Sequence, residues 1–297
     1  MQAAAQLNLA AEFVWKRDNG GEIRERKENM KARIKFSKCG SMRFIGHLDV
    51  MRYFQKAFRR AEIPVSYSQG FSPHQLMSFA SPLGIGLSSD AEYMDLTLDD
   101  AESADRMVTR MNEQMNEEIT VREFTLLKED AKPSMAMLSA CDYMIAAKPG
   151  RQSFLERVDL AALAAELTAR EQIEITKKTK RSEKVVDIRP NIYHVALTEE
   201  DFAAQTGSVY GTSCLEGSEY RPLLYMQLTA GSVVNIKPEL VLEAMAQMAG
   251  ETFDFLDVQI HRMEMYGDAN GKKGEVHTLS DEVPCKLVPL SQYEQME

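Results

Sequence analysis

The sequence lacks the cysteine clusters that build local metal centres. Its four cysteines lie about 70 to 100 residues apart, at Cys39, Cys141, Cys214 and Cys285. Zinc and iron–sulfur sites formed by one segment need ligands only a few residues apart. We therefore interpret the four cysteines as reduced thiols. We expect no metal site and no cofactor bound by this chain.

Long apolar runs are also absent. No stretch approaches the roughly 18 residues that span a bilayer, and residues 1–29 do not show the basic-then-apolar order of a signal peptide. These observations predict a cytoplasmic protein without a membrane segment. The run PLGIGLSS places Gly84 and Gly86 before two serines, but it is neither GxGxxG nor a phosphate loop followed by Lys-Ser/Thr.

Charge is distributed unevenly along the 297 residues. The whole chain carries a net charge of −10, whereas residues 31–80 hold nine Lys or Arg against Asp49 and Glu62. Such asymmetry favours an anionic partner at one face of an otherwise acidic protein. The alternative is a solvated basic helix face.

Hydrophobic periodicity predicts an α+β fold. Residues 30–128 have the order βαββαβ, and residues 140–267 repeat it with an added hairpin and a Gly/Ser-rich insertion near 201–220. We interpret these as two tandem ferredoxin-like (split βαβ) units, the second enlarged. Residues 1–29 are predicted to be a disordered extension, and 268–297 a flexible tail.

The predicted helix from His47 to Ala61 has two distinct faces. Apolar residues, beginning with Leu48, recur at three- and four-residue spacing and predict a buried stripe. Basic residues recur on another face, where they would track phosphates. This basic ridge consists of Arg52, Lys56, Arg59 and Arg60.

Three residues near this helix are catalytic candidates. His47 and His74 could each transfer a proton or bind phosphate, although an isolated histidine is more often a hydrogen-bonded loop residue. Asp49 lies in the first helical turn, where it could serve function or stabilise the helix end.

The segment VSYSQGFSPH predicts a turn that carries planar side chains suited to stacking on a base. The alternative is that these side chains anchor the loop to the sheet. The stacking and loop candidates are Tyr67, Ser68, Gly70 and Phe71.

Further basic residues extend the predicted RNA- or anion-binding set. Lys38 and Arg43 precede the helix, and the segment KKTKRSEKVVDIRP indicates a basic hairpin that would grip an RNA backbone or remain solvated. The candidates in that segment are Lys177, Lys178, Lys180, Arg181 and Arg189.

The run from FSKCGSMRFIGHLD through YSQGFSPHQLMSFASPLGIGL to EYMDLTL resembles the bacterial radical-SAM-linked proteins, a family built on a domain of unknown function. The resemblance covers residues 33–98 most strongly and extends loosely through RPNIYHVAL and the last helix. It implies a companion of a radical SAM protein, sometimes one with a cobalamin-type domain, and an association with RNA or ribosome modification. Because this chain lacks a cysteine triad, the iron–sulfur cluster and S-adenosylmethionine are expected on the partner.

Three functions are consistent with these patterns. The leading hypothesis is a non-catalytic accessory protein that binds a structured RNA, such as tRNA or rRNA, for modification by a radical SAM enzyme. The second is a metal-independent RNA-processing or RNA-modifying enzyme that uses His47 or His74; the tandem architecture is similar to CRISPR RNA-processing endonucleases, but their C-terminal glycine-rich loop is not evident. The third is a scaffold that binds a nucleotide or S-adenosylmethionine.

Overall fold

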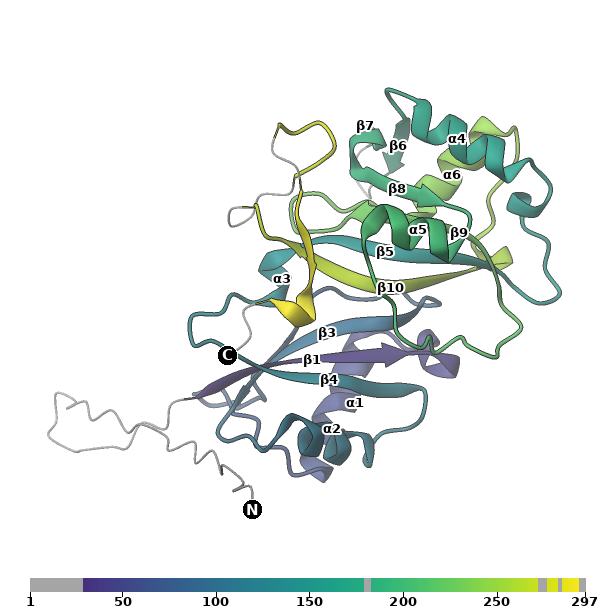
Figure 1. The fold of residues 1–297 in the computed structure, drawn as a ribbon. Helices are drawn as coiled ribbons and strands as arrows, with labels where there is room; N and C mark the ends of the chain where they lie inside the picture. Colours follow the sequence, from purple (N-terminus) through teal and green to yellow (C-terminus); the bar gives the residue numbers. More distant parts are fainter. Residues whose placement is uncertain (1–28, 179–182, 272–276, 283–284, 294–297) are drawn as a thin grey trace, which may run out of the picture.

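A computed structural model describes residues 29–178, 183–271, 277–282 and 285–293. The extension predicted over residues 1–29 therefore lies outside the described part except for its last residue. The fold is α+β, as the sequence predicts. In the described residues, a nine-stranded mixed sheet is accompanied by six α-helices and a separate two-stranded hairpin (Figure 1). No helix in these residues combines the length and apolar character needed to cross a membrane.

We call β1 to β4 with their helices the first half and β5 to β10 the second half. The first half contains β1 (Met30–Lys38), α1 (His47–Arg60), β2 (Met77–Phe79), β3 (Ser88–Leu98), α2 (Ala104–Asn112) and β4 (Ile119–Leu127). After α3 (Ser134–Met137), the second half contains β5 (Leu138–Ala147), α4 (Leu160–Ala169), β6 (Glu174–Lys178), β7 (Glu183–Asp187), β8 (Ile192–Ala196), α5 (Glu199–Thr206), β9 (Arg221–Thr229), α6 (Pro238–Met248) and β10 (Val258–Asp268).

The sheet has the strand order β4-β1-β3-β10-β5-β9-β8, with β2 paired to β3. Neighbouring strands within each half are antiparallel. The two halves meet where β3 and β10 run parallel, through only two residue pairs, His261 with Ser88 and Arg262 with Ser89. The sheet is therefore continuous but narrow at this junction.

Two large hydrophobic clusters stabilise the halves. One packs α1 and α2 against the first half, around Phe36, Phe54 and Met107. The other lies in the second half but also includes Leu87 and Tyr93 from the first half. Because this core crosses the boundary, the halves are packed together rather than merely linked.

The structure corrects two expectations about local packing. Leu48 is 59% exposed and Val50 is buried instead, because the buried face of α1 follows Val50, Phe54, Ala57 and Phe58, and Leu48 lies outside it. The predicted flexible tail contains β11 (Leu287–Pro289), which pairs with β10, and Leu290 is fully buried. This part of the tail belongs to the sheet because β11 pairs with the end of β10, whose edge would otherwise be left unpaired.

Candidate functional site

Polar side chains gather at the junction between β3 and β10. Ser88, Glu92, His261 and Arg262 are all buried there, in a region of the sheet that would otherwise be apolar. Burying such groups is unfavourable unless they are paired or hydrogen-bonded. The concentration of buried polar groups therefore makes the junction one candidate functional site, beside the exposed basic ridge and hairpin.

One part of the junction contains a buried charge cluster. A guanidinium nitrogen of Arg262 lies 3.3 Å from a carboxylate oxygen of Glu92. Burial raises the pKa of Glu92, and the charge of Arg262 opposes that rise. The ammonium group of Lys38 donates to the carbonyl oxygen of Ile45 at 3.0 Å, and burial lowers its pKa against the opposing charge of Glu92. Lys38 is only 2% exposed, so it is an interior residue and not part of an exposed anion-binding surface.

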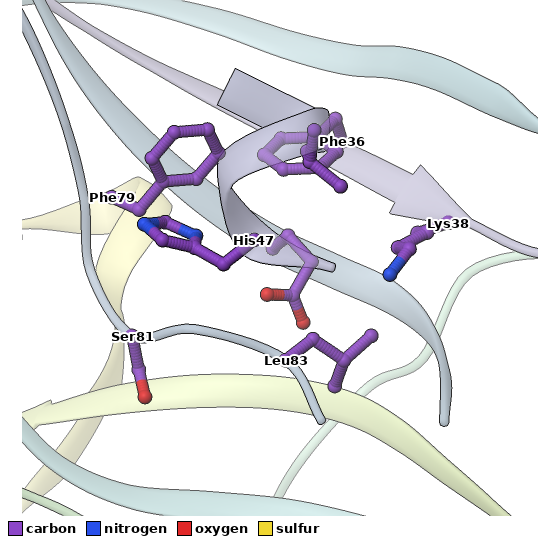
Figure 2. Close-up of a pocket in the computed structure, with 8 residues that line it drawn as sticks. Phe36, Lys38, His47, Phe79, Ser81 and Leu83 are labelled. Atoms are coloured by element: carbon purple, nitrogen blue, oxygen red, sulfur yellow. The ribbon is translucent and has the colours of Figure 1, made fainter. Parts of the chain in front are cut away.

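His47 borders a small cavity beside this cluster. The cavity measures about 10 Å³, room for one water, and Lys38, Glu92 and Ser81 also line it (Figure 2). The imidazole packs edge-on against Phe79, with ring centroids 4.8 Å apart. Burial and then the charge of Lys38 lower the pKa of His47, which favours the neutral imidazole. In the neutral form, one ring nitrogen can accept a hydrogen bond.

A larger cleft of about 160 Å³ also opens at the junction. Its walls include Lys35 and Glu264, whose side chains form an ion pair at 2.7 Å. The hydroxyl of Tyr93 donates to the other oxygen of Glu264 at 2.6 Å. Although burial opposes it, Glu264 raises the pKa of Lys35 and keeps its ammonium charged. Charged groups thus face a cavity large enough for several waters or a small polar ligand.

Asp90 and His261 form another part of the cleft wall. The Nε2 atom of His261 lies 2.7 Å from Asp90, and its Nδ1 atom lies 2.9 Å from the hydroxyl of Ser88. Burial alone would raise the pKa of Asp90, but hydrogen bonding and charge from His261 hold it below its ordinary value. Ser88 has no exposed surface and does not line the cleft, so its hydroxyl serves to orient His261.

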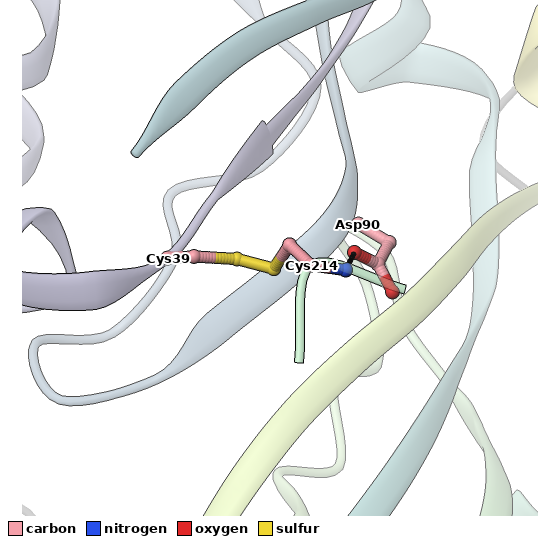
Figure 3. Close-up of side chains that lie close together, drawn as sticks. All are labelled: Cys39, Asp90 and Cys214. Carbon is pink, nitrogen blue, oxygen red and sulfur yellow. Dashed lines mark hydrogen bonds between the residues drawn. A yellow bond between two sulfur atoms is a disulfide. The ribbon is translucent and has the colours of Figure 1, made fainter. Parts of the chain in front are cut away.

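The cysteine interpretation requires a correction. Cys39 and Cys214, 175 residues apart in sequence, are joined by a disulfide with a Cα–Cα distance of 6.3 Å. Figure 3 shows Cys39 at the end of β1 and Cys214 on a loop beside Asp90. The spacing of cysteines in sequence gave no sign of this contact because the sheet alone brings the two segments together. Cys141 and Cys285 are free.

The basic ridge lies on the outer face of α1, and all four of its side chains are exposed. Arg59 and Arg60 donate to neutral backbone carbonyls of Gln55 and Gln114. Arg52 pairs with Asp49 at 3.2 Å, so the candidate Asp49 contacts the ridge and the helix end. The charges at Arg59 and Arg60 therefore remain available to an anionic partner.

The predicted turn forms a small hairpin that projects from the protein. Tyr67 pairs with Gln75, and Gly70 at the tip adopts φ +112°. The ring of Phe71 is fully exposed, and Tyr67 is also exposed. The aromatic side chains thus do not anchor this loop to the sheet.

His74 belongs to that hairpin, where its Nδ1 atom lies 2.8 Å from the hydroxyl of Ser68. His47, in contrast, packs on Phe79 at the far end of β2. The two candidate histidines therefore do not share one site.

The remaining basic candidates have different environments. Arg189 donates to the carbonyls of Thr168, Arg170 and Ile192, and so caps the end of α4. Arg43 lies over the rings of Phe44 and Tyr220. Lys177 and Lys178 are the last two residues of β6, whereas Lys180 and Arg181 fall outside the described residues.

Sequence reasoning missed the polar residues of the junction. Asp90, His261 and Glu264 lie on β3 and β10, and their sequence signal was the presence of charged side chains in otherwise apolar strands. That signal marks polar residues within a predicted core. It does not show which of these residues are in contact, because the residues that meet between β3 and β10 are about 170 positions apart in sequence.

Fold and site together define an α+β protein with a polar cleft between two halves of one sheet. Residues 31–259, roughly three quarters of the chain, match a family described as uncharacterized proteins conserved in bacteria, DUF2344. The chain belongs to this family. No curated protein matches the sequence.

Proposed function

We propose that this protein is a non-catalytic accessory protein that binds a structured RNA, such as tRNA or rRNA, for modification by a radical SAM enzyme. The observation that carries the RNA part is the exposed basic ridge, in which Arg59 and Arg60 donate to neutral backbone carbonyls. Arginine and lysine in such an arrangement contact phosphates without reading base sequence.

The projecting hairpin supports the same proposal. Phe71 lies at a tip whose backbone needs the positive φ of Gly70, and six residues separate the end of α1 from Tyr67. Exposed aromatic rings stack on unpaired bases with little sequence preference. The ridge would thus hold the backbone while the hairpin contacts a base. The radical SAM partner rests on the resemblance of residues 33–98.

The proposal includes a repeated architecture. The orders β4-β1-β3, with β2 on β3, and β10-β5-β9-β8 follow the same pattern of connections, which supports two tandem split βαβ units. The hairpin β6–β7 and helix α5 would then be insertions in the second unit. A cytoplasmic location fits a protein that acts on RNA.

Binding of labelled tRNA and rRNA fragments to the purified protein tests the RNA function. If the four ridge cations contact four phosphates of a single strand, affinity should fall about fiftyfold between about 50 and 200 mM salt. Lys56→Glu with Arg59→Glu should weaken binding and flatten this salt dependence. Both residues are exposed, so the fold should be retained.

The matched control is Lys128→Glu with Lys237→Glu, which makes the same charge change at two exposed lysines outside the ridge. It should leave most of the affinity and the steep salt dependence. Equal affinity in the ridge and control variants would contradict the proposed RNA site. Co-elution with a radical SAM protein tests the partner separately.

A second candidate function is a metal-independent RNA-processing enzyme that uses His47. The favouring observation is its neutral imidazole beside a water-sized cavity and Lys38. Under this alternative, RNA cleavage or modification would disappear in His47→Gln and persist in His74→Gln. A nucleotide scaffold has less support, because the backbone N–H of Gly86 already donates to the carbonyl oxygen of Arg43 at 2.8 Å.

A further inference from the structure

Cys39, Asp90 and Cys214 bring three metal-ligating side chains together at the junction. The two sulfur atoms and a carboxylate oxygen lie within 4.8 Å of one another. In the described residues, this is the one group of three Cys, His, Asp or Glu side chains that meets this distance. Figure 3 shows that the side chains approach from β1, β3 and the loop before β9.

The backbone holds the three positions in place. Lys38 and Ser89 are register partners on the antiparallel strands β1 and β3, so Cys39 and Asp90 each lie one residue from this pair. The N–H of Cys214 donates to one oxygen of Asp90 at 2.7 Å, which fixes the loop against β3. The ligand atoms are thus positioned by the sheet and by one direct bond.

A buried histidine holds the other side of the carboxylate. His261 contacts the second oxygen of Asp90 at 2.7 Å, and Ser88 contacts the opposite nitrogen of its ring. Hydrogen-bonded partners of this kind orient metal ligands and tune the affinity for the ion. His261 is therefore a positioning residue for Asp90.

We propose that the reduced protein binds one Zn²⁺ ion through the thiolates of Cys39 and Cys214 and the carboxylate of Asp90. Two thiolates and a carboxylate form a donor set that suits zinc. Asp90 also borders the junction cleft of about 160 Å³, so solvent or a ligand in the cleft can occupy the fourth position. Three protein ligands and one open position are the arrangement of a reactive zinc site rather than a closed structural one.

The carboxylate distinguishes this site from a simple disulfide. A neutral disulfide gains little from the facing negative charge of Asp90, a partly exposed side chain that also contacts His261. A divalent cation at the same place is stabilised by that charge.

The disulfide and the zinc complex are alternative states of the same two cysteines. A dithiol reductant transfers two electrons and two protons, which breaks the sulfur–sulfur bond and leaves two thiols and an oxidised dithiol. Zinc then displaces one proton from each thiol and binds both thiolates. The sulfur atoms must separate to roughly 3.7 Å, given Zn–S distances of about 2.3 Å.

Metal analysis and cobalt titration of the full chain test the proposal. Protein purified with a dithiol and without chelator should contain about one zinc per chain. Co²⁺ added to the reduced, metal-free protein should give thiolate-to-metal charge-transfer absorption and the visible bands of tetrahedral cobalt. Oxidised wild-type protein should give neither signal, and reduction should restore both.

Variants separate this site from unspecific thiol binding. Cys214→Ser should lose stoichiometric binding, and Asp90→Asn should weaken it by about tenfold or more. Cys285→Ser is the matched control because it removes a free thiol outside the cluster, and it should bind like the wild type. If the Cys214 variant does not fold, the reversible loss of cobalt binding on oxidation still tests the site. Absence of binding to reduced wild-type protein, or full binding by Cys214→Ser, would overturn the proposal.

Discussion

At the residue scale, Asp142 shows how the interior accommodates an isolated carboxyl group. Its side chain is fully buried and accepts hydrogen bonds from the hydroxyls of Tyr210 and Tyr266, at 2.7 and 2.6 Å. Burial raises the pKa of Asp142 from 3.8 to about 7, although the two tyrosines oppose the rise. The folded state therefore holds a proton that the unfolded chain releases at lower pH.

This residue predicts a specific pH dependence of stability. Because folding raises the pKa of this carboxyl group, its protonated form stabilises the folded state fully below the unfolded-state pKa near 3.8. That stabilisation is lost as the pH rises through the folded-state pKa of about 7. Asp142→Asn removes the ionisation while the amide oxygen can still accept from the tyrosines. Between about pH 5 and 8, the unfolding free energy of the Asp142→Asn variant should fall less than that of the wild type. The two decreases should differ by on the order of a few kcal/mol.

Urea denaturation at several pH values measures this difference. Asp130→Asn, at an exposed position, is the control and should retain the wild-type pH dependence. An Asp142→Asn curve parallel to that of the wild type would show that the carboxyl group is not the source.

At the element scale, the regular helices and strands were predictable because their periodicity is local. The order βαββαβ predicted for residues 30–128 matches the observed β1, α1, β2, β3, α2 and β4. Sequence reasoning missed α5 within the Gly/Ser-rich insertion. The missed signal was local: Thr198 caps the helix by accepting from Asp201, acidic residues fill the first turn, and Gly207 ends it with φ +70°.

The end of α4 provides a prediction about Arg189. Its guanidinium donates to three carbonyls, two of them at the end of α4, where backbone oxygens otherwise lack partners. Arg189→Ala should lower the unfolding free energy by about 1–3 kcal/mol. RNA affinity should not change, because this guanidinium is directed at the protein's own backbone.

Thermal or urea unfolding and RNA titration measure the two effects separately. Arg151→Ala removes an exposed guanidinium whose ion pair with Asp257 spans 3.9 Å, and should change stability by less than about 0.5 kcal/mol. A stable Arg189→Ala variant that binds RNA weakly would instead support the anion-binding role predicted from sequence.

At the scale of the whole molecule, the junction could not be predicted from local patterns. Glu92 and Arg262 are about 170 residues apart, and Cys39 and Cys214 are 175 apart. Their proximity depends on the parallel pairing of β3 with β10, which hydrophobic periodicity does not specify. The sequence indicated the exposed ridge because its four residues share one helix, whereas the junction requires the assembled sheet.

The narrow junction also predicts how the disulfide affects stability. Only two parallel residue pairs join β3 and β10, while the Cys39–Cys214 bond links the first half to a loop of the second. Closing a loop across 175 residues restricts the unfolded chain and should stabilise the oxidised protein by about 2–5 kcal/mol. In the presence of a chelator, reduction should therefore lower the urea midpoint.

Cys39→Ser should reproduce the reduced midpoint without any reductant, because it prevents the same covalent bond from forming. The control Cys285→Ser should respond to reduction like the wild type, since Cys285 is not in the disulfide. Equal midpoints for oxidised and reduced wild-type protein would mean that the bond does not restrict the unfolded chain under these conditions. The urea midpoint of the reduced protein can also be measured with zinc in place of the chelator. An ion held by Cys39, Asp90 and Cys214 should raise the midpoint of the reduced wild type, whereas zinc should not raise that of Cys39→Ser.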